Sequence, residues 1–388
     1  MRVLHVVSDW KWTGPAEPML LLAAAQRARG DEVALACPDA PAGEWGLGDR
    51  ARGAGLTPAL ILERARGAHW LRDRRDAAGL RALLRAQRFD VVHAWHTRDH
   101  VLAWRAARRA APAAAVVRSW PRAERIPRWP WTRWLLGRAS DGVAFPSEAA
   151  AHANRRLARG GPARGVAGAV DLARFRPGAP DPALRERLGL AGATGVVGVV
   201  ARVQARRRFD LLLDAFSRLA ARDAGARLLV VGRGTRLDEL ARRPAAELGI
   251  AGRVVFAGWR GEDYPDVLRA LDVLTYLVPG SDGSCRAVLE AAACAIPTVA
   301  TRRGALPELV RHAETGLVVD EDPESLAGAW ASLLADPARR ASLGRAARAH
   351  ALACFAPEQL AQRVAELYAE AIAQRRGARA SREPRSKR

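Results

Sequence analysis

The stretch LDVLTYLVPGSDGSCRAVLEAAACAIPTVAT, residues 271–301, decides the fold. An apolar run leads into a glycine turn, an alanine-rich run follows, and the short apolar run PTVAT closes the stretch. This order predicts a buried strand, a tight turn, a helix of small residues and a second strand. Two acids lie within it: Asp282 in the turn and Glu290 inside the apolar helix, where a buried carboxylate needs a partner.

The same alternation of apolar runs and longer amphipathic stretches extends in both directions. Continuous apolar runs are typical of parallel strands that are covered on both faces. A proline-bearing segment at 170–190 divides them into two series, so the sequence predicts two doubly wound α/β sheets with a boundary near residue 178. The predicted strands are 3–8, 32–37, 90–95, 113–119, 142–145, 195–202, 226–232, 253–258, 271–278, 297–301 and 315–320.

The composition excludes several classes of protein. The 388 residues carry a net charge of +21, but Lys11 and Lys387 are the only lysines, and this arginine bias is typical of a GC-rich genome. No nucleic-acid-binding motif accompanies the charge.

No run is long enough for a spanning helix and no signal-peptide pattern is visible, so we expect a cytoplasmic protein. Four scattered cysteines form neither a disulfide framework nor a zinc motif: Cys37, Cys285, Cys294 and Cys354.

The turn at 281–290 is the first candidate site. The N–H groups at the start of a helix over Gly283, Ser284, Cys285 and Arg286 favour an anion such as phosphate. Asp282 could accept hydrogen bonds from hydroxyls, and ribose hydroxyls would satisfy Glu290. The structural alternative is a helix-capping aspartate and an exposed glutamate.

Three further segments carry polar residues at predicted strand ends. Arg202 and the arginines at 206–208 could clamp a diphosphate, or form a solvated basic loop. The loop containing Gly14 lets a ligand approach the backbone closely, although it is not a dinucleotide fingerprint. Of the histidines in HAWHTRDH, residues 93–100, His96 is the candidate for acid–base chemistry, whereas we expect His93 in the core.

The segment 118–138 combines tryptophans with arginines, a mixture that suits an anionic membrane surface. The alternative is an arm whose tryptophans pack onto the domain. The residues in question are Trp120, Trp129, Trp131 and Trp134. The acidic triplet at 320–322 comes directly before Pro323. This order predicts a helix cap rather than a metal site.

Over nearly its whole length the chain resembles glycosyltransferase family 4, retaining enzymes of the GT-B fold. The acid at 282, the glutamate eight residues later, the small residues after it and the strand led by Pro297 carry this resemblance, which is strongest over 195–320. It implies two Rossmann-like domains facing across a cleft. Residues 1–178 would bind the acceptor and 179–355 the nucleotide sugar, a helix at 356–373 would pack back on the first domain, and 374–388 would be a disordered basic tail.

The resemblance also implies roles at matching positions. Arg202 matches the arginine that contacts the donor diphosphate, and Glu290 matches the glutamate that binds the ribose. Asp282 stands where a glutamate usually contacts the transferred sugar. Gly14 matches the amino-terminal glycine loop near the diphosphate and the acceptor. We therefore expect Arg202, Arg207, Asp282 and His96 in catalysis, and Gly14 together with 282–286 and Glu290 at the donor.

The chain departs from the family pattern in three places. Arg207 and Arg208 stand where lysine and glycine are usual, and Gly283, Ser284 and Cys285 replace Gly-Phe-Gly. Pro121 stands where a histidine often lies near the reacting sugar, and His96 is the candidate to replace it.

The resemblance implies a metal-independent retaining transferase that moves a sugar from a nucleoside-diphosphate donor to a hydroxyl acceptor. The acceptor expected is a cell-surface polysaccharide or glycolipid precursor, reached by peripheral attachment to the inner face of the membrane. No cofactor is expected. A nucleotide-sugar epimerase of the same fold and a catalytically degenerate binding protein remain alternatives, and a nucleic-acid binder would show steep salt dependence.

Overall fold

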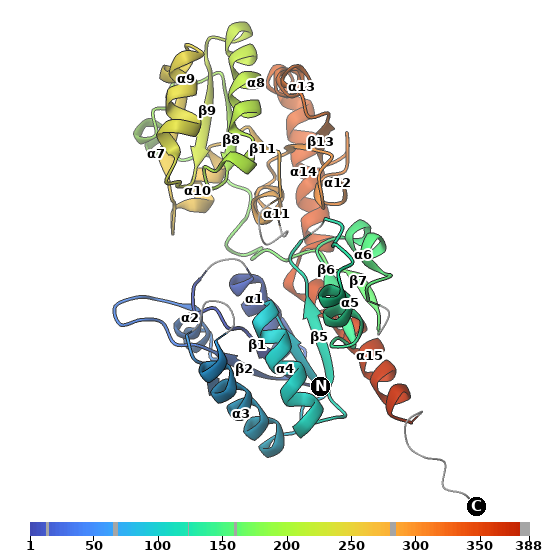
Figure 1. Ribbon diagram of the computed structural model, residues 1–388. Helices are drawn as coiled ribbons and strands as arrows, with labels where there is room; N and C mark the ends of the chain where they lie inside the picture. Colours follow the sequence, from blue (N-terminus) through green and yellow to red (C-terminus); the bar gives the residue numbers. More distant parts are fainter. Residues whose placement is uncertain (13–14, 65–68, 123, 159–160, 280–284, 381–388) are drawn as a thin grey trace, which may run out of the picture. The chain divides into compact units, whose positions relative to one another are not determined.

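The computed structural model describes residues 1–12, 15–64, 69–122, 124–158, 161–279 and 285–380 (Figure 1). The contacts within the chain divide it into two compact units. Unit 1 comprises Met1–Ala169 and the chain from Pro357 on, and unit 2 is Val170–Ala356.

Unit 1 is a parallel sheet covered on both faces. Its seven strands, counted in the described residues, have the order β3-β2-β1-β4-β5-β6-β7. One apolar core lies between the sheet and α1, α2 and α15, and another lies between the sheet and α3 and α4. The strands are β1 (Arg2–Val6), β2 (Glu32–Cys37), β3 (Leu60–Ile61), β4 (Val91–Ala94), β5 (Ala115–Ser119), β6 (Gly142–Phe145) and β7 (Ala163–Gly165). The helices are α1 (Ala16–Ala28), α2 (Leu47–Gly53), α3 (Trp70–Ala86), α4 (Thr97–Ala110), α5 (Pro130–Gly137), α6 (Glu148–Asn154) and α15 (Pro357–Ala380).

Unit 2 is a second parallel sheet, with the order β10-β9-β8-β11-β12-β13 over its six described strands. Its main core joins the sheet to α8 and α13 around the fully buried Trp330. The strands are β8 (Gly195–Val200), β9 (Ala226–Val231), β10 (Val254–Gly258), β11 (Val273–Tyr276), β12 (Thr298–Thr301) and β13 (Gly316–Val319). The α-helices are α7 (Pro182–Arg187), α8 (Phe209–Arg222), α9 (Arg243–Glu247), α10 (Tyr264–Arg269), α11 (Arg286–Ala293), α12 (Leu306–Leu309), α13 (Pro323–Ala335) and α14 (Pro337–Cys354), and shorter helical turns are η1 (Ala205–Arg207), η2 (Asp238–Arg242) and η3 (Ala251–Arg253).

The predicted strands correspond to strands of the structure, and the two parallel sheets confirm the predicted fold class. The sequence missed β3 and β7, which are two and three residues long and lie at the edges of the unit 1 sheet. Such short edge strands need no continuous apolar run, because only one side of each is paired. The acidic triplet does cap a helix, since the Asp322 side chain accepts the backbone N–H of Ser325 at the start of α13.

Two predicted boundaries differ from the structure. The chain passes from unit 1 to unit 2 after Ala169 rather than near residue 178, because the intervening segment packs within unit 2. There the Val170 N–H donates to the Phe355 carbonyl, and Phe175 lies edge-on to Tyr264. The last helix does not end at residue 373 but continues to Ala380, because alanine, glutamine and arginine all favour helix. Residues 381–388 lie outside the described residues.

Helix α15, red in Figure 1, packs against α1, β5 and β6 of unit 1. Its Tyr368 is fully buried, and the hydroxyl lies 2.7 Å from Nδ1 of His93 on β4. The other ring nitrogen of His93, Nε2, lies 2.9 Å from the Ser119 hydroxyl. His93 is therefore a core residue, and it links the end of the chain to the middle of the unit 1 sheet.

Candidate functional site

Glu290 lies in α11 of unit 2 and is 95% buried. The Tyr264 hydroxyl donates a 2.8 Å hydrogen bond to its Oε2, and the Arg286 guanidinium lies 3.8 Å from Oε1. Burial and the adjacent carboxylate raise the pKa of Tyr264 well above its usual value, so the phenol remains a donor at neutral pH. Glu290 is thus a buried residue of α11. This excludes the alternative that it is only an exposed glutamate on the helix surface.

No local signal in the sequence indicates Tyr264, which precedes Glu290 by 26 residues. It begins α10, whereas Glu290 lies on the helix after the next strand. The expectation that a buried carboxylate needs a donor was correct, but only the fold shows which donor is within reach.

Arg207 lies at the carboxyl edge of the same sheet. Its Nη1 donates a 2.6 Å hydrogen bond to the Val278 carbonyl, just beyond β11, and its guanidinium lies 5.9 Å from the centre of the Tyr276 ring. Among the described residues its buried Nε has no acceptor. The cation is therefore held at the carboxyl end of β11.

Arg208 has left-handed backbone angles, with φ 56° and ψ 46°, at the start of α8. A glycine adopts this conformation most easily, and glycine is the residue that the resemblance implies here. The Arg208 side chain forms ion pairs with Asp210 at 3.0 Å and with Glu321 at 3.4 Å. The replacement of glycine by arginine has therefore kept the backbone turn.

Arg202 lies two residues beyond the end of β8, and it is exposed. Close backbone contacts fix this segment, since Ala201 N–H donates to the Val231 carbonyl and Val203 N–H to the Arg233 carbonyl. A Cβ atom at Gly232, where φ is +143°, would lie 2.1 Å from the Ala201 carbonyl oxygen. Only glycine allows β9 to pass this close to the residues that carry Arg202.

Cys285 precedes α11 with φ 48° and is fully buried. A left-handed non-glycine residue is uncommon and costs roughly 1 kcal/mol or more. Helix α11 starts at Arg286, which is the last residue of the range 284–286 in which the sequence predicted its start. Asp282, Gly283 and Ser284, as well as Gly14 in unit 1, lie outside the described residues.

His96 is the N-cap residue of α4 in unit 1, and its side chain is 32% exposed. Its Nδ1 lies 3.1 Å from Oδ2 of the buried Asp99, which also accepts the His96 N–H at 2.8 Å. A carboxylate can only accept, so Nδ1 carries the proton and a neutral ring keeps Nε2 as its basic nitrogen. Burial alone would raise the pKa of Asp99, but hydrogen bonds from His96 and Ser8 outweigh it and lower that pKa.

The four tryptophans of the 118–138 segment have different surroundings. Trp129 and Trp131 are 67% and 50% exposed, whereas Trp134 packs against Trp131 and against Trp104 of α4. Trp120 is half-buried and packs on the core between β6 and α6. Two of the four are therefore available at the surface, and exposed arginines, Arg125, Arg128 and Arg133, lie beside them in the sequence.

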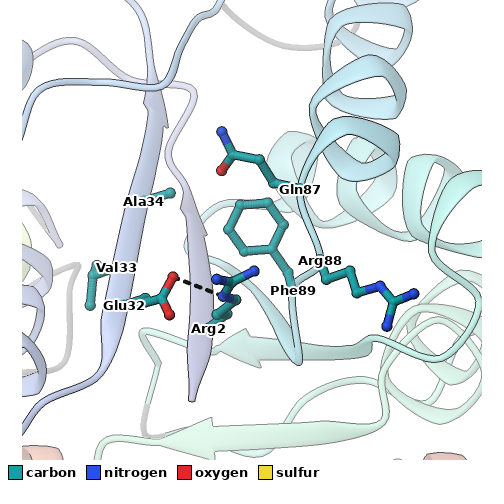
Figure 2. A pocket seen from close by; sticks show the side chains of 7 residues that line it. All are labelled: Arg2, Glu32, Val33, Ala34, Gln87, Arg88 and Phe89. Carbon is teal, nitrogen blue, oxygen red and sulfur yellow. Dashed lines mark ion pairs between the residues drawn. The ribbon is translucent and has the colours of Figure 1, made fainter.

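A hollow of about 230 Å³ lies at the amino ends of β1 and β2 (Figure 2). Arg2 and Glu32 form an exposed 2.8 Å ion pair within it. None of the predicted site residues lines this hollow, and open α/β sheets bind ligands at the opposite, carboxyl edge. Its lining residues are Arg2, Glu32, Val33, Ala34, Gln87, Arg88 and Phe89.

Two further properties concern the described residues alone. They contain no cluster of three histidine, cysteine or acidic side chains that could hold a metal ion. None of their helices has both the length and the apolar character that crossing a bilayer requires.

Comparison with known proteins places the chain in a family. The family model for Glycosyltransferase Family 4 matches residues 14–174, and that for Glycosyl transferases group 1 matches residues 194–336. The chain belongs to glycosyltransferase family 4. The match covers both units and includes Arg202, Arg207 and Glu290, which confirms the resemblance seen in the sequence.

Curated relatives match about half of this family 4 chain. The D-inositol 3-phosphate glycosyltransferase of Rhodococcus opacus is 42% identical over 196 residues, which are 48% of this chain and 43% of the relative. The GDP-mannose-dependent alpha-(1-6)-phosphatidylinositol monomannoside mannosyltransferase of Mycolicibacterium smegmatis is 39% identical over 212 residues, 51% of this chain and 54% of the relative. The chain thus spans about half the length of the curated relatives it matches.

Anabaena HepE, solved in complex with UDP, shares the fold of the family 4 chain. The superposition covers 95% of this chain and 100% of HepE, with a TM-score of 0.76 and 19% sequence identity. At this identity the likeness concerns the fold alone.

Proposed function

We propose that the protein is a retaining glycosyltransferase that moves a sugar from a nucleoside-diphosphate donor to a hydroxyl acceptor. The buried Glu290 carboxylate, oriented by Tyr264 in the unit that matches Glycosyl transferases group 1, is the observation that carries this proposal. Such a carboxylate suits the paired hydroxyls of a ribose, because its oxygens can accept two hydrogen bonds at once.

Arg202, Arg207 and the start of α11 would bind the two phosphates. When the bond from the sugar carbon to the diphosphate breaks, negative charge develops on the leaving oxygen, and these groups would stabilise it. The acceptor oxygen then forms the new bond to the same carbon and gives its proton to the departing phosphate. Asp282 would bind hydroxyls of the transferred sugar, and His96 would lie on the acceptor side in place of the histidine expected at Pro121.

The acceptor in this proposal is lipid-linked. The mycobacterial relative is named for a phosphatidylinositol mannoside, which is a lipid. Trp129 and Trp131 are exposed next to arginines, a composition that binds the headgroup region of anionic bilayers. We therefore propose a peripheral enzyme of glycolipid or cell-surface polysaccharide synthesis.

Thermal unfolding with a panel of nucleoside diphosphates and nucleotide sugars tests the donor site. A ligand at 100 times its Kd stabilises the native state by about 2.7 kcal/mol, which raises the midpoint by roughly 5–11 °C for a unit of this size. We expect such a shift for the diphosphates and sugar conjugates of one base. If no nucleotide shifts the midpoint, the donor site assigned here is wrong.

Co-sedimentation with liposomes tests the membrane surface. We expect binding to vesicles with anionic lipid at low salt, little binding to zwitterionic vesicles, and at least a tenfold weaker affinity for the double variant Trp129→Ala, Trp131→Ala. Trp259→Ala is the matched control, because Trp259 is 63% exposed but belongs to unit 2. Equal losses in both variants, or no binding by the wild type, would contradict the proposed surface.

A further inference from the structure

Arg118 in β5 is a buried cation, and two of its three guanidinium nitrogens have no hydrogen-bond acceptor among the described residues. The residue is 2% exposed, and among the described residues neither its Nε nor its Nη1 has an acceptor. Arg108 in α4 shows the usual arrangement, because its Nη2 pairs with Asp141 at 2.6 Å. Buried arginines are normally paired in this way. The described part of the chain therefore leaves two buried Arg118 donors free to bind an acceptor.

Asp99 is near Arg118 but is already occupied. Its carboxylate accepts the Ser8 N–H at 2.8 Å and two groups of His96 at 2.8 and 3.1 Å. Burial lowers the pKa of Arg118 to about 10 and the Asp99 charge raises it, so the guanidinium stays cationic at neutral pH. The Asp99 carboxylate thus favours the charged form of Arg118 without making a direct ion pair.

A second donor and a helix start lie beside Arg118. The guanidinium carbon lies 5.6 Å from the centre of the Trp120 ring, and the buried Nε1–H of Trp120 has no acceptor among the described residues. The Arg118 charge also acts on Asp99 and His100 in the first turn of α4. The start of this 14-residue helix carries the partial positive charge of its dipole. Arg118 and Trp120 therefore offer free donors at the carboxyl end of β5, and the start of α4, which Asp99 caps, follows the neighbouring β4.

We propose that Arg118, Trp120 and the start of α4 form a binding site for an oxyanion, a phosphate or a carboxylate group, carried by the acceptor. Guanidinium binds both groups in bidentate fashion, and an indole N–H adds a third hydrogen bond. Open parallel sheets bind ligands at this edge. The site itself rests on the buried donors, whereas its assignment to the acceptor rests on the proposed function, which puts the donor on unit 2.

The two orphan nitrogens of Arg118 are shielded from solvent, so a ligand reaches them only if a neighbour moves. Trp120 lies over the guanidinium and is half-buried. The proposal therefore requires the Trp120 indole to turn toward the anion when it binds. A change of tryptophan fluorescence on anion binding, absent in Trp120→Phe, would report this movement.

Calorimetric titration of the full chain with inorganic phosphate and with acetate, at constant ionic strength, tests the site. Arg118→Gln should weaken phosphate binding 10- to 100-fold and Trp120→Phe about threefold or more. Arg122→Gln, which removes the charge of an exposed arginine four residues later, should have no effect. Phosphate binding should survive Arg207→Gln, which separates this site from the proposed donor site on unit 2.

Unchanged phosphate binding in Arg118→Gln would overturn the proposal. Water molecules would then be the hydrogen-bond acceptors of the Arg118 guanidinium. If that variant does not fold, Trp120→Phe decides: weaker phosphate binding and a lost fluorescence change support the site, and wild-type values overturn it. The proposed transferase function has a separate test, the nucleotide-dependent shift of the thermal midpoint. A failure of that test can therefore be distinguished from a failure of phosphate binding at Arg118. A charged acceptor should show a raised KM with unchanged kcat in Arg118→Gln, whereas a neutral acceptor should not.

Discussion

Glu290→Ala should abolish the thermal shift that the matching nucleotide gives to the wild-type protein. The substitution removes both acceptor oxygens of a carboxylate that is 95% buried and 2.8 Å from its tyrosine donor. Hydrogen bonds to a charged group contribute about 1.5–3 kcal/mol each, so losing two should weaken nucleotide binding at least 100-fold. Transferase activity at subsaturating donor should fall by a similar factor.

The comparison must be of ligand-induced shifts rather than of midpoints, because Glu290→Ala also leaves the Tyr264 hydroxyl without its acceptor. Tyr264→Phe keeps the carboxylate but removes its donor, and should weaken nucleotide binding by about three- to tenfold. Glu247→Ala, an exposed glutamate on α9, is the matched control and should keep the full shift. A full shift in Glu290→Ala would mean that the nucleotide binds elsewhere.

Unit 1 should lose stability steeply as the pH falls from about 6.5 toward 4. Burial lowers the pKa of His5 to about 4 and that of His100 to about 3, and it lowers the pKa of His93 well below its usual value. An unfolded histidine takes up its proton near pH 6.5, so below that pH the unfolded chain binds more protons than the folded one. The stability is therefore complete above pH 6.5 and is lost progressively below it, by about 3 kcal/mol for His5 alone.

Hydrogen exchange at several pH values, corrected for intrinsic rates, measures this loss by unit. Amides of β1 and β4 should lose protection on acidification earlier than those of β8 and β9. His5→Asn should flatten the pH dependence, because the Trp95 Nε1–H, 3.2 Å from the His5 Nδ1, can donate to the asparagine oxygen instead. His152→Gln, at an exposed histidine of α6, should leave the pH dependence unchanged. Parallel losses in both units would argue against the buried histidines as the cause.

The sequence by itself determined the two α/β units, because parallel strands covered on both faces must be continuously apolar, and this pattern is local. It also indicated the strand, turn and helix around Glu290, since glycine and a buried acid stand out within a few residues. The match to Glycosyl transferases group 1 over residues 194–336 includes Arg202, Arg207 and Glu290.

Only the tertiary structure decided which groups meet. The partner of Glu290 lies 26 residues away, and the partner of His93 lies 275 residues away on α15. No periodicity records such pairs, because hydrogen-bond partners depend on how strands and helices pack rather than on their spacing in the sequence. The boundary after Ala169 and the two Arg118 nitrogens that lack an acceptor among the described residues are also decided by the tertiary structure, because both depend on how distant segments pack.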